Sequence, residues 1–205
     1  MELIEKDIEY LRSELTKFAH GKRLTHSYAV EREAKKLGEL FGVEGNDLNR
    51  LRVAAVLHDI TKEIKTDGQV ALCQKHGIEV KSEDLACPKV FHSLTGAYEA
   101  RLLYPDYVDG EIFDAIKYHT TGREDMTLFD KLIYLADYIE ETRDFPDCIR
   151  LREYFYGKAA TTEHLNDTLL LSFDMTIRNL IDEGHPIHGT TLKARNAIIK
   201  ELKQC

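Results

Sequence analysis

Residues 51–62 read LRVAAVLHDITK, an apolar run that ends in a histidine, an aspartate and a lysine. At 3.6 residues per turn, Leu51, Ala55 and His58 fall on one line of a helix. Asp59 lies beside this line. The pattern therefore predicts a helix that buries its apolar face and carries the pair His58-Asp59 into the interior of the protein.

The rest of the chain also repeats apolar residues at intervals of three and four, and no segment of useful length alternates as a half-buried strand does. We predict an all-α fold, one helical bundle of about nine helices over residues 1–205, with no linker between domains. Glycine, proline and capping residues mark the expected ends. The expected helices lie at about 2–19, 25–42, 46–59, 67–77, 88–103, 109–119, 127–140, 148–157, 161–184 and from 191 onward.

The net charge of −8 argues against binding to duplex nucleic acid, which needs a basic face. A small anionic ligand is still compatible with it, because a few basic residues or a metal in one cleft attract phosphate. Charges interrupt every apolar run before the roughly 20 residues that a bilayer requires, and the first residues do not resemble a secretory signal. The 4 cysteines show no zinc-ribbon or disulfide spacing. We expect a cytoplasmic protein with reduced thiols that binds no membrane; its oligomeric state stays open, a homodimer included.

Other histidines and one aspartate extend apolar stripes in the same way as His58. They are His26, His92, His119 and, at the margin of its stripe, Asp137. A single histidine on an apolar face is more often a buried, hydrogen-bonded residue than a metal ligand, by roughly four to one, and His92 alone would be read so. We expect His20, His76 and His164 to be solvated, because their neighbours are polar. His185 and His188 lie in a loop before the last helix, where backbone amides are free to meet a ligand.

The pair His58-Asp59 is harder to explain without a metal. Burying a carboxylate beside an imidazole is costly unless a cation or a hydrogen-bond network compensates. Imidazole nitrogens and carboxylate oxygens without a thiolate suit a divalent iron, manganese, zinc, nickel or cobalt ion with a position left for water. The sequence thus predicts a metal centre with mixed nitrogen and oxygen ligands.

The order of these motifs resembles the HD-domain superfamily of metal-dependent phosphohydrolases, whose signature dipeptide is His58-Asp59 here. Longer segments resemble the bacterial YqeK-type proteins, and the similarity extends from about residue 10 to about 200. The resemblance implies an HD-domain helical bundle that hydrolyses diadenosine tetraphosphate symmetrically into two ADP. The matching segments are FHSLTGA at 91–97, YHTTGR at 118–123, YLADYIE at 134–140, RDFP at 143–146 and ARN at 194–196.

The resemblance also implies roles for individual residues. The ligands of an iron centre would be His26, His58, Asp59 and Asp137. His92 and His119 would face the phosphates or hold a second metal, and these two residues, Asp59 and Lys62 are the expected catalytic residues. The expected substrate contacts are His26, Asp59, Lys62, His92, His119, Thr120, Arg123, Asp137 and Arg143. For Arg123 a local ion pair with Glu124 or Asp125 competes with a substrate contact.

Two other interpretations stay open. Another HD-type phosphohydrolase, acting on a deoxynucleotide, a cyclic nucleotide or a guanosine polyphosphate, would share the metal ligands and differ in its loops. A non-catalytic nucleotide sensor would keep the helical core and use the ligand to set its shape. A panel of nucleotides and a comparison of binding with turnover separate the three.

Overall fold

A computed structural model describes residues 2–204, so that Met1 and Cys205 lie outside the described part. Between these limits the chain forms eleven α-helices and one 3₁₀ turn, with no strand, which confirms the all-α prediction. No helix in this range is long and apolar enough to cross a membrane. The elements are α1 (Glu5–Leu15), α2 (Gly21–Leu40), α3 (Gly45–Leu57), α4 (Thr66–Lys75), α5 (Ser82–Ala86), η1 (Pro88–Val90), α6 (Phe91–Leu103), α7 (Gly110–Tyr118), α8 (Leu128–Ile139), α9 (Pro146–Tyr156), α10 (Thr162–Asp182) and α11 (Gly189–Leu202).

The predicted helix starts at Asp109 and Thr127 are confirmed by their capping bonds, and of Thr161 and Thr162, the two expected starts of the next long helix, Thr161 is the cap. Asp109 accepts a hydrogen bond from the backbone N–H of Ile112, and the Thr127 and Thr161 side chains each accept one from the third residue beyond. These side chains satisfy amides that have no partner inside their helix. The cap residues therefore set the starts of α7, α8 and α10.

The count of about nine helices was too low. The predicted helix at 88–103 is divided into η1 and α6, and α5 was not predicted. None of the five residues of α5 is buried, so no apolar periodicity marks it in the sequence. The first helix also ends at Leu15 rather than near 19, and α2 begins at Gly21, four residues before the expected start.

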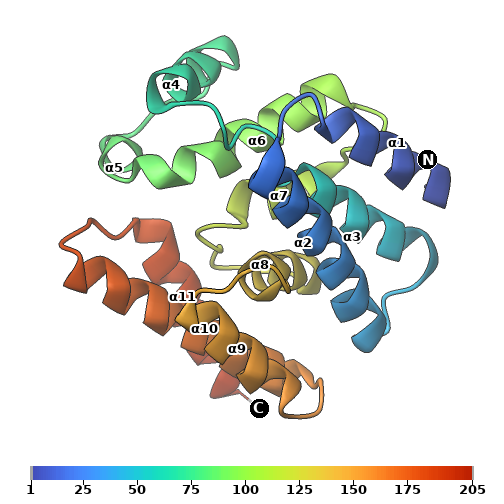
Figure 1. Cartoon of the computed structure of the whole chain (residues 1–205). Coiled ribbons are helices and arrows are strands. Elements are labelled where there is room, and N and C mark those ends of the chain that lie inside the picture. The colour runs from blue at the N-terminus through green and yellow to red at the C-terminus, as the bar shows by residue number, and fades with distance from the viewer. Residues whose placement is uncertain (1, 205) are drawn as a thin grey trace.

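Helix α3 is the centre of the bundle. Every residue from Leu51 to Leu57 is buried, and α3 packs against α1, α2, α7 and α8 (Figure 1). A helix that is buried on all sides belongs to the core. Helices α9, α10 and α11 lie together beside α8 in the lower part of Figure 1, and α4 and α5 lie in its upper part. The loop between α10 and α11 reaches α5, where His188 contacts Asp84.

The α-helical hydrogen-bond pattern stops at the end of α3, and the chain continues to about residue 64 through tight turns. Backbone N–H groups of Ile60, Lys62 and Ile64 each donate to the carbonyl three residues earlier, at 3.2, 2.9 and 3.0 Å. Such short turns direct successive side chains differently from an α-helix. They present Asp59 and Lys62 toward α6 and α8, where the candidate site is formed.

Candidate metal centre

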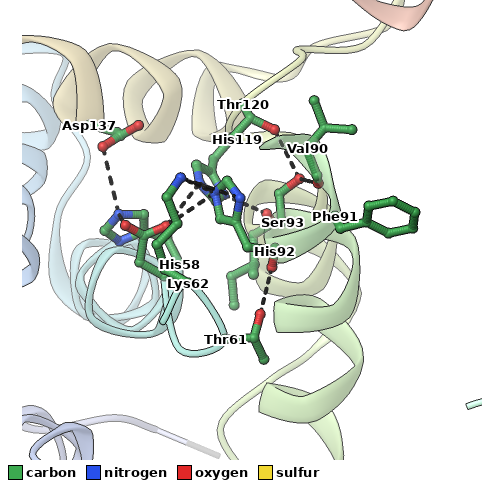
Figure 2. A network of polar contacts seen from close by, with 12 residues as sticks. His58, Thr61, Lys62, Val90, Phe91, His92, Ser93, His119, Thr120 and Asp137 are labelled. Atoms are coloured by element: carbon green, nitrogen blue, oxygen red, sulfur yellow. Dashed lines mark hydrogen bonds and ion pairs between the residues drawn. The ribbon is translucent and has the colours of Figure 1, made fainter. Parts of the chain in front are cut away.

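Six side chains from five parts of the fold form one group, which we call the His–Asp cluster: His26, His58, Asp59, His92, His119 and Asp137. His26 comes from α2, His92 from α6 and Asp137 from α8, while His119 directly follows α7. Figure 2 shows His58, Lys62, His92 and His119 converging, with Asp137 facing them from α8. The structure therefore brings together all six histidines and aspartates that the sequence analysis selected.

Asp59 lies in the middle of the cluster. Its Oδ1 lies 3.2 Å from His92 Nε2 and 3.5 Å from His119 Nε2. Its Oδ2 lies 3.5 Å from His58 Nε2 and 3.7 Å from His26 Nε2. The two oxygens thus face two different pairs of imidazoles.

Asp137 completes the cluster on the side of His26 and His58. Its Oδ1 lies 3.0 Å from His26 Nε2 and 3.7 Å from His58 Nε2. Two overlapping triads result, His26–His58–Asp137 and His58–Asp59–His119, and the ligand atoms of each lie within 4.8 Å of one another. Either triad has the donors and the spacing of a transition-metal site.

Three buried atoms of the cluster test whether these residues fit a metal. His26 Nε2, His58 Nε2 and Asp59 Oδ1 are buried, and although carboxylate or imidazole atoms of the cluster lie close to them, none of the three makes a hydrogen bond of acceptable geometry in the described part of the chain. Buried polar atoms without a partner cost free energy, and each needs an explanation. A divalent ion between them would satisfy all three, so the residues present fit a metal.

The outer ring nitrogens of three histidines hold the inner ones in position. His58 Nδ1 lies 2.7 Å from the carbonyl of Ala55, and His119 Nδ1 lies 2.8 Å from that of Ile116. His26 Nδ1 contacts the fully buried carboxylate of Glu140 at 3.0 Å. A proton on each Nδ1 leaves Nε2 unprotonated and directed inward, as a metal requires.

The charge states also suit a cation. Burial raises the pKa of Asp59, but His58, His119 and His92 outweigh it and hold that pKa well below its usual value. Burial, together with the nearby Lys62 and His119, outweighs the effect of Asp59 and lowers the pKa of His92 to about 4. Burial lowers the pKa of His26, yet Asp137 and Glu140 outweigh it and raise the value to about 8. Without a metal, a proton on His26 balances part of the carboxylate charge.

A cavity of about 450 Å³ opens beside the cluster. Its inner end is polar, with Lys62, His92, His119, Thr120, Asp137 and Arg143. Tyr134 and Tyr138 of α8 and Leu180 of α10 line another side. The remaining side is lined by residues 86–90 and by His185, Pro186 and His188. Together with the rest of α5 and of the loop before α11, these residues make up what we call the outer wall, residues 82–90 and 185–190. An elongated ligand with an anionic end and an aromatic end matches this lining.

Basic side chains stand at the inner end of the cavity. Lys62 Nζ lies 2.9 Å from His92 Nε2, and burial lowers the lysine pKa. Arg143 Nη2 lies 2.5 Å from Asp137 Oδ1, and this carboxylate raises the arginine pKa. The Thr120 hydroxyl lies 2.9 Å from that of Ser93. Lys62, Thr120 and Arg143 are therefore all close to the cluster.

Arg123 is the expected substrate contact that lies outside both the cavity lining and the His–Asp cluster; His26 and Asp59 belong to the cluster but do not line the cavity. Its guanidinium pairs with Asp114 at 3.0 Å and with Asp130 at 2.8 Å. Asp125, the neighbour considered in the sequence analysis, lies at 3.7 Å. Arg123 therefore forms ion pairs with the protein itself, as the alternative to a substrate contact predicted. Its main partners lie 7 and 9 residues away along the chain and are not the adjacent Glu124 or Asp125.

Not all of the histidines outside the cluster are solvated as expected. His20 is exposed, and His76 is half-buried and lies 2.6 Å from Glu99. The prediction that His164 is solvated was wrong, because α10 packs on α9 and His164 Nε2 lies 3.0 Å from the Phe155 carbonyl. His185 and His188 both line the cavity.

Three kinds of residue at the site were missed by the sequence analysis. Arg23 contacts Asp59 at 2.6 Å. It lies three residues before His26 and therefore on the same face of the helix, so the spacing of the two residues could have indicated it. Glu140 follows the last residue of α8 and carries no such signal. Tyr138 and Thr176 line the cavity from helices whose relative position no local pattern reports.

The fold and the cluster define an all-α protein with a buried histidine–aspartate metal site. Residues 23–142 match the model of the HD domain, and the chain belongs to this family. It is 32% identical over 177 residues to a Bacillus subtilis protein named bis(5'-nucleosyl)-tetraphosphatase, symmetrical, covering 86% of this chain and 89% of that one. A Halalkalibacterium halodurans protein of the same name is 32% identical, with 88% and 91% covered.

A solved structure shares the whole architecture. It comes from Clostridium acetobutylicum and is described as a predicted HD superfamily hydrolase involved in NAD metabolism. The TM-score is 0.83 at 33% sequence identity, and the match covers 94% of this chain and 97% of that chain. The similarity therefore extends well beyond residues 23–142, the part that matches the HD domain.

Proposed function

We propose that this protein is a metal-dependent hydrolase that cleaves diadenosine tetraphosphate symmetrically into two ADP. The observation that carries the proposal is the position of the His–Asp cluster at the cationic end of a cavity with aromatic and apolar sides. The names of the Bacillus and Halalkalibacterium relatives support the substrate. We treat residues 1–205 as one domain, because α6, α8 and α10 line the same cavity.

The metal ligands in this proposal are His26, His58, Asp59 and Asp137. Iron is our first choice of metal, and manganese, zinc, nickel and cobalt suit the same donors. A divalent metal in a hydrolytic site supplies Lewis-acid activation of water and of phosphoryl oxygens. The protein part of the site is preorganised for this, since the outer ring nitrogens of His26 and His58 already have partners.

The other residues at the inner end bind and orient the phosphates. Lys62 and Arg143 offset negative charge on the phosphate oxygens during transfer, which lowers the barrier most in a site shielded from water. His92 and His119, whose Nε2 atoms lie 3.2 Å apart, face the same oxygens from the wall of the cavity. Thr120 supplies a hydroxyl donor. The ADP that leaves departs as an anion stabilised by these contacts.

We place the reaction in the cytoplasm. Cys73, Cys87 and Cys148 are free thiols, as a reducing compartment requires.

The aromatic side chains Tyr134 and Tyr138 give the cavity a surface on which a nucleoside packs. A nucleotide is therefore the ligand class that the cavity suits best.

Product analysis tests the proposal. Protein purified without added metal or chelator is analysed for bound metal and then incubated with diadenosine tetraphosphate. We expect ADP as the sole nucleotide product, and chelator-treated protein serves as the inactive control. AMP together with ATP would contradict symmetrical cleavage.

A nucleotide panel addresses the rival functions. It contains deoxynucleotides, cyclic nucleotides, guanosine polyphosphates and NAD⁺, the last because of the description of the Clostridium structure. Faster turnover of any of these would replace the proposed substrate. Tight binding of all of them without turnover would instead favour a sensor.

A further inference from the structure

Arg23 approaches the His–Asp cluster from a side that the cavity does not reach. Its Nη1 donates to Asp59 Oδ2 at 2.6 Å. Lys62 and Arg143 line the cavity, whereas Arg23 is not among its lining residues. The cluster therefore has a second cationic edge.

This edge is open to solvent. The Arg23 side chain is 31% exposed, while the Asp59 side chain beneath it is 2% exposed. Across residues 2–204 the structure gives the Arg23 guanidinium one hydrogen bond, to Asp59, and a guanidinium carries five N–H donors. Most of its donors are thus available to a ligand that reaches the cluster from outside.

The start of α2 is held beside the turn that carries Asp59. His20 contacts Glu63 with both its backbone N–H and its ring Nδ1, each at 3.2 Å. Arg23 lies one helical turn before His26 and on the same face of α2. The same helix therefore positions a cluster histidine and, next to it, a partly exposed guanidinium.

The proposed substrate has two nucleotide halves, joined at the bond that is cleaved. One half fills the cavity, so the other half must leave the cluster in another direction. Its phosphates then need a cation outside the cavity, and a guanidinium suits phosphate oxygens through paired N–H donors. Arg23 is the basic residue in contact with the cluster that meets this requirement.

We propose that Arg23 binds the phosphates of the second nucleotide half, the one that stays outside the cavity, while its bond to Asp59 orients it. This inference rests on the proposed dinucleotide substrate. It assigns Arg143 to the half inside the cavity and Arg23 to the half outside. A mononucleotide would then meet Arg143 and not Arg23.

Binding of two probes to the metal-loaded protein tests the assignment. The probes are ADP and a methylene-bridged, non-hydrolysable analogue of diadenosine tetraphosphate. We expect Arg23→Gln to weaken binding of the analogue by about tenfold or more, as for the loss of a charge-assisted hydrogen bond, and to leave ADP binding unchanged. The matched variant Arg143→Gln weakens binding of both probes.

The metal content of the variants shows whether Arg23 binds the phosphates or only holds Asp59 in place. If Arg23→Gln loses the metal, Arg23 only holds Asp59 in place, and the assignment is wrong. Equal losses for ADP and the analogue, or no loss for either, would also overturn it. Arg23→Lys keeps the charge and should recover part of the affinity for the analogue.

The wild-type protein distinguishes this failure from failure of the proposed function. If the wild type neither binds the analogue nor converts diadenosine tetraphosphate into ADP, both proposals fall. If the wild type does both and the Arg23 variants behave like it, only the assignment of Arg23 falls. Circular dichroism of each variant confirms that the helical fold is retained.

Discussion

The His–Asp cluster and the outer wall face each other across one cavity but are built differently. The cluster comes from helices around buried α3, and the outer ring nitrogens of His26, His58 and His119 have fixed partners. The outer wall contains α5, which buries no residue, and its two parts are linked by His188 and Asp84 at 3.0 Å and by a Cys87 contact with the Pro186 carbonyl. The difference indicates that the reaction depends on the His–Asp cluster, whereas the outer wall influences how the ligand is held.

The largest effect is expected when the cluster loses its central carboxylate. Asp59→Ala should remove the bound metal and lower kcat/KM by about a thousandfold or more, because Asp59 faces four histidines. Metal analysis and product formation measure the two effects. The control is Asp114→Ala, which changes a carboxylate outside the cavity and should keep the metal. A D59A variant with unchanged metal content would refute the ligand assignment.

The loop that follows His119 connects the cluster to α10 and α11, and Gly122 is its critical residue. Gly122 has φ +64°, and an added Cβ would lie 2.7 Å from Phe173 and 2.9 Å from Ala194. Gly122→Ala should therefore combine backbone strain of about 1–2 kcal/mol with an overlap of about 1–3 kcal/mol. Urea unfolding measures the loss of stability.

The matched control is Gly77→Ala. Gly77 has φ +63° and nothing within 4 Å of an added Cβ, so only the backbone strain of about 1–2 kcal/mol remains. Equal losses of stability in the two variants would show that the packing of Gly122 against Phe173 and Ala194 is not tight.

A smaller effect is expected from the residue that orients His26. Glu140→Gln removes the charge that faces His26 Nδ1 at 3.0 Å, and should lower the metal affinity by about tenfold. Glu141→Gln is the control, since Glu141 is exposed and pairs with Arg32. Metal titration in the presence of a competing chelator compares them, and equal affinities would contradict the role of Glu140.

The outer wall should give the smallest effect. Asp84→Ala removes the contact with His188 and should raise KM about two- to fivefold, with kcat and metal content unchanged. His188→Asn should act similarly. Because the two residues share one contact, the double variant should cost little more than either single one. A large loss of kcat would mean that the wall belongs to the catalytic machinery.

Much of the fold was accessible from local patterns. The apolar repeats and the caps Asp109, Thr127 and Thr161 predicted most helices, since both act within one helical turn. The expected count of about nine was too low, and the helix with no predicted counterpart is α5, which is too short to show a repeat. His164 failed for another reason: its sequence neighbours are polar, but α9 covers it.

The chain by itself determined which residues face the interior, because a helix of 3.6 residues per turn converts spacing directly into direction. This was enough to select His26, His58, His92 and His119 as inward-facing residues, and the resemblance to the HD-domain superfamily joined them with Asp59 and Asp137 into one site. The crossing of helices decided the rest. Only packing brings Glu140 to His26 and Arg23 to Asp59, because contacts between helices depend on how they cross and not on the spacing within either one.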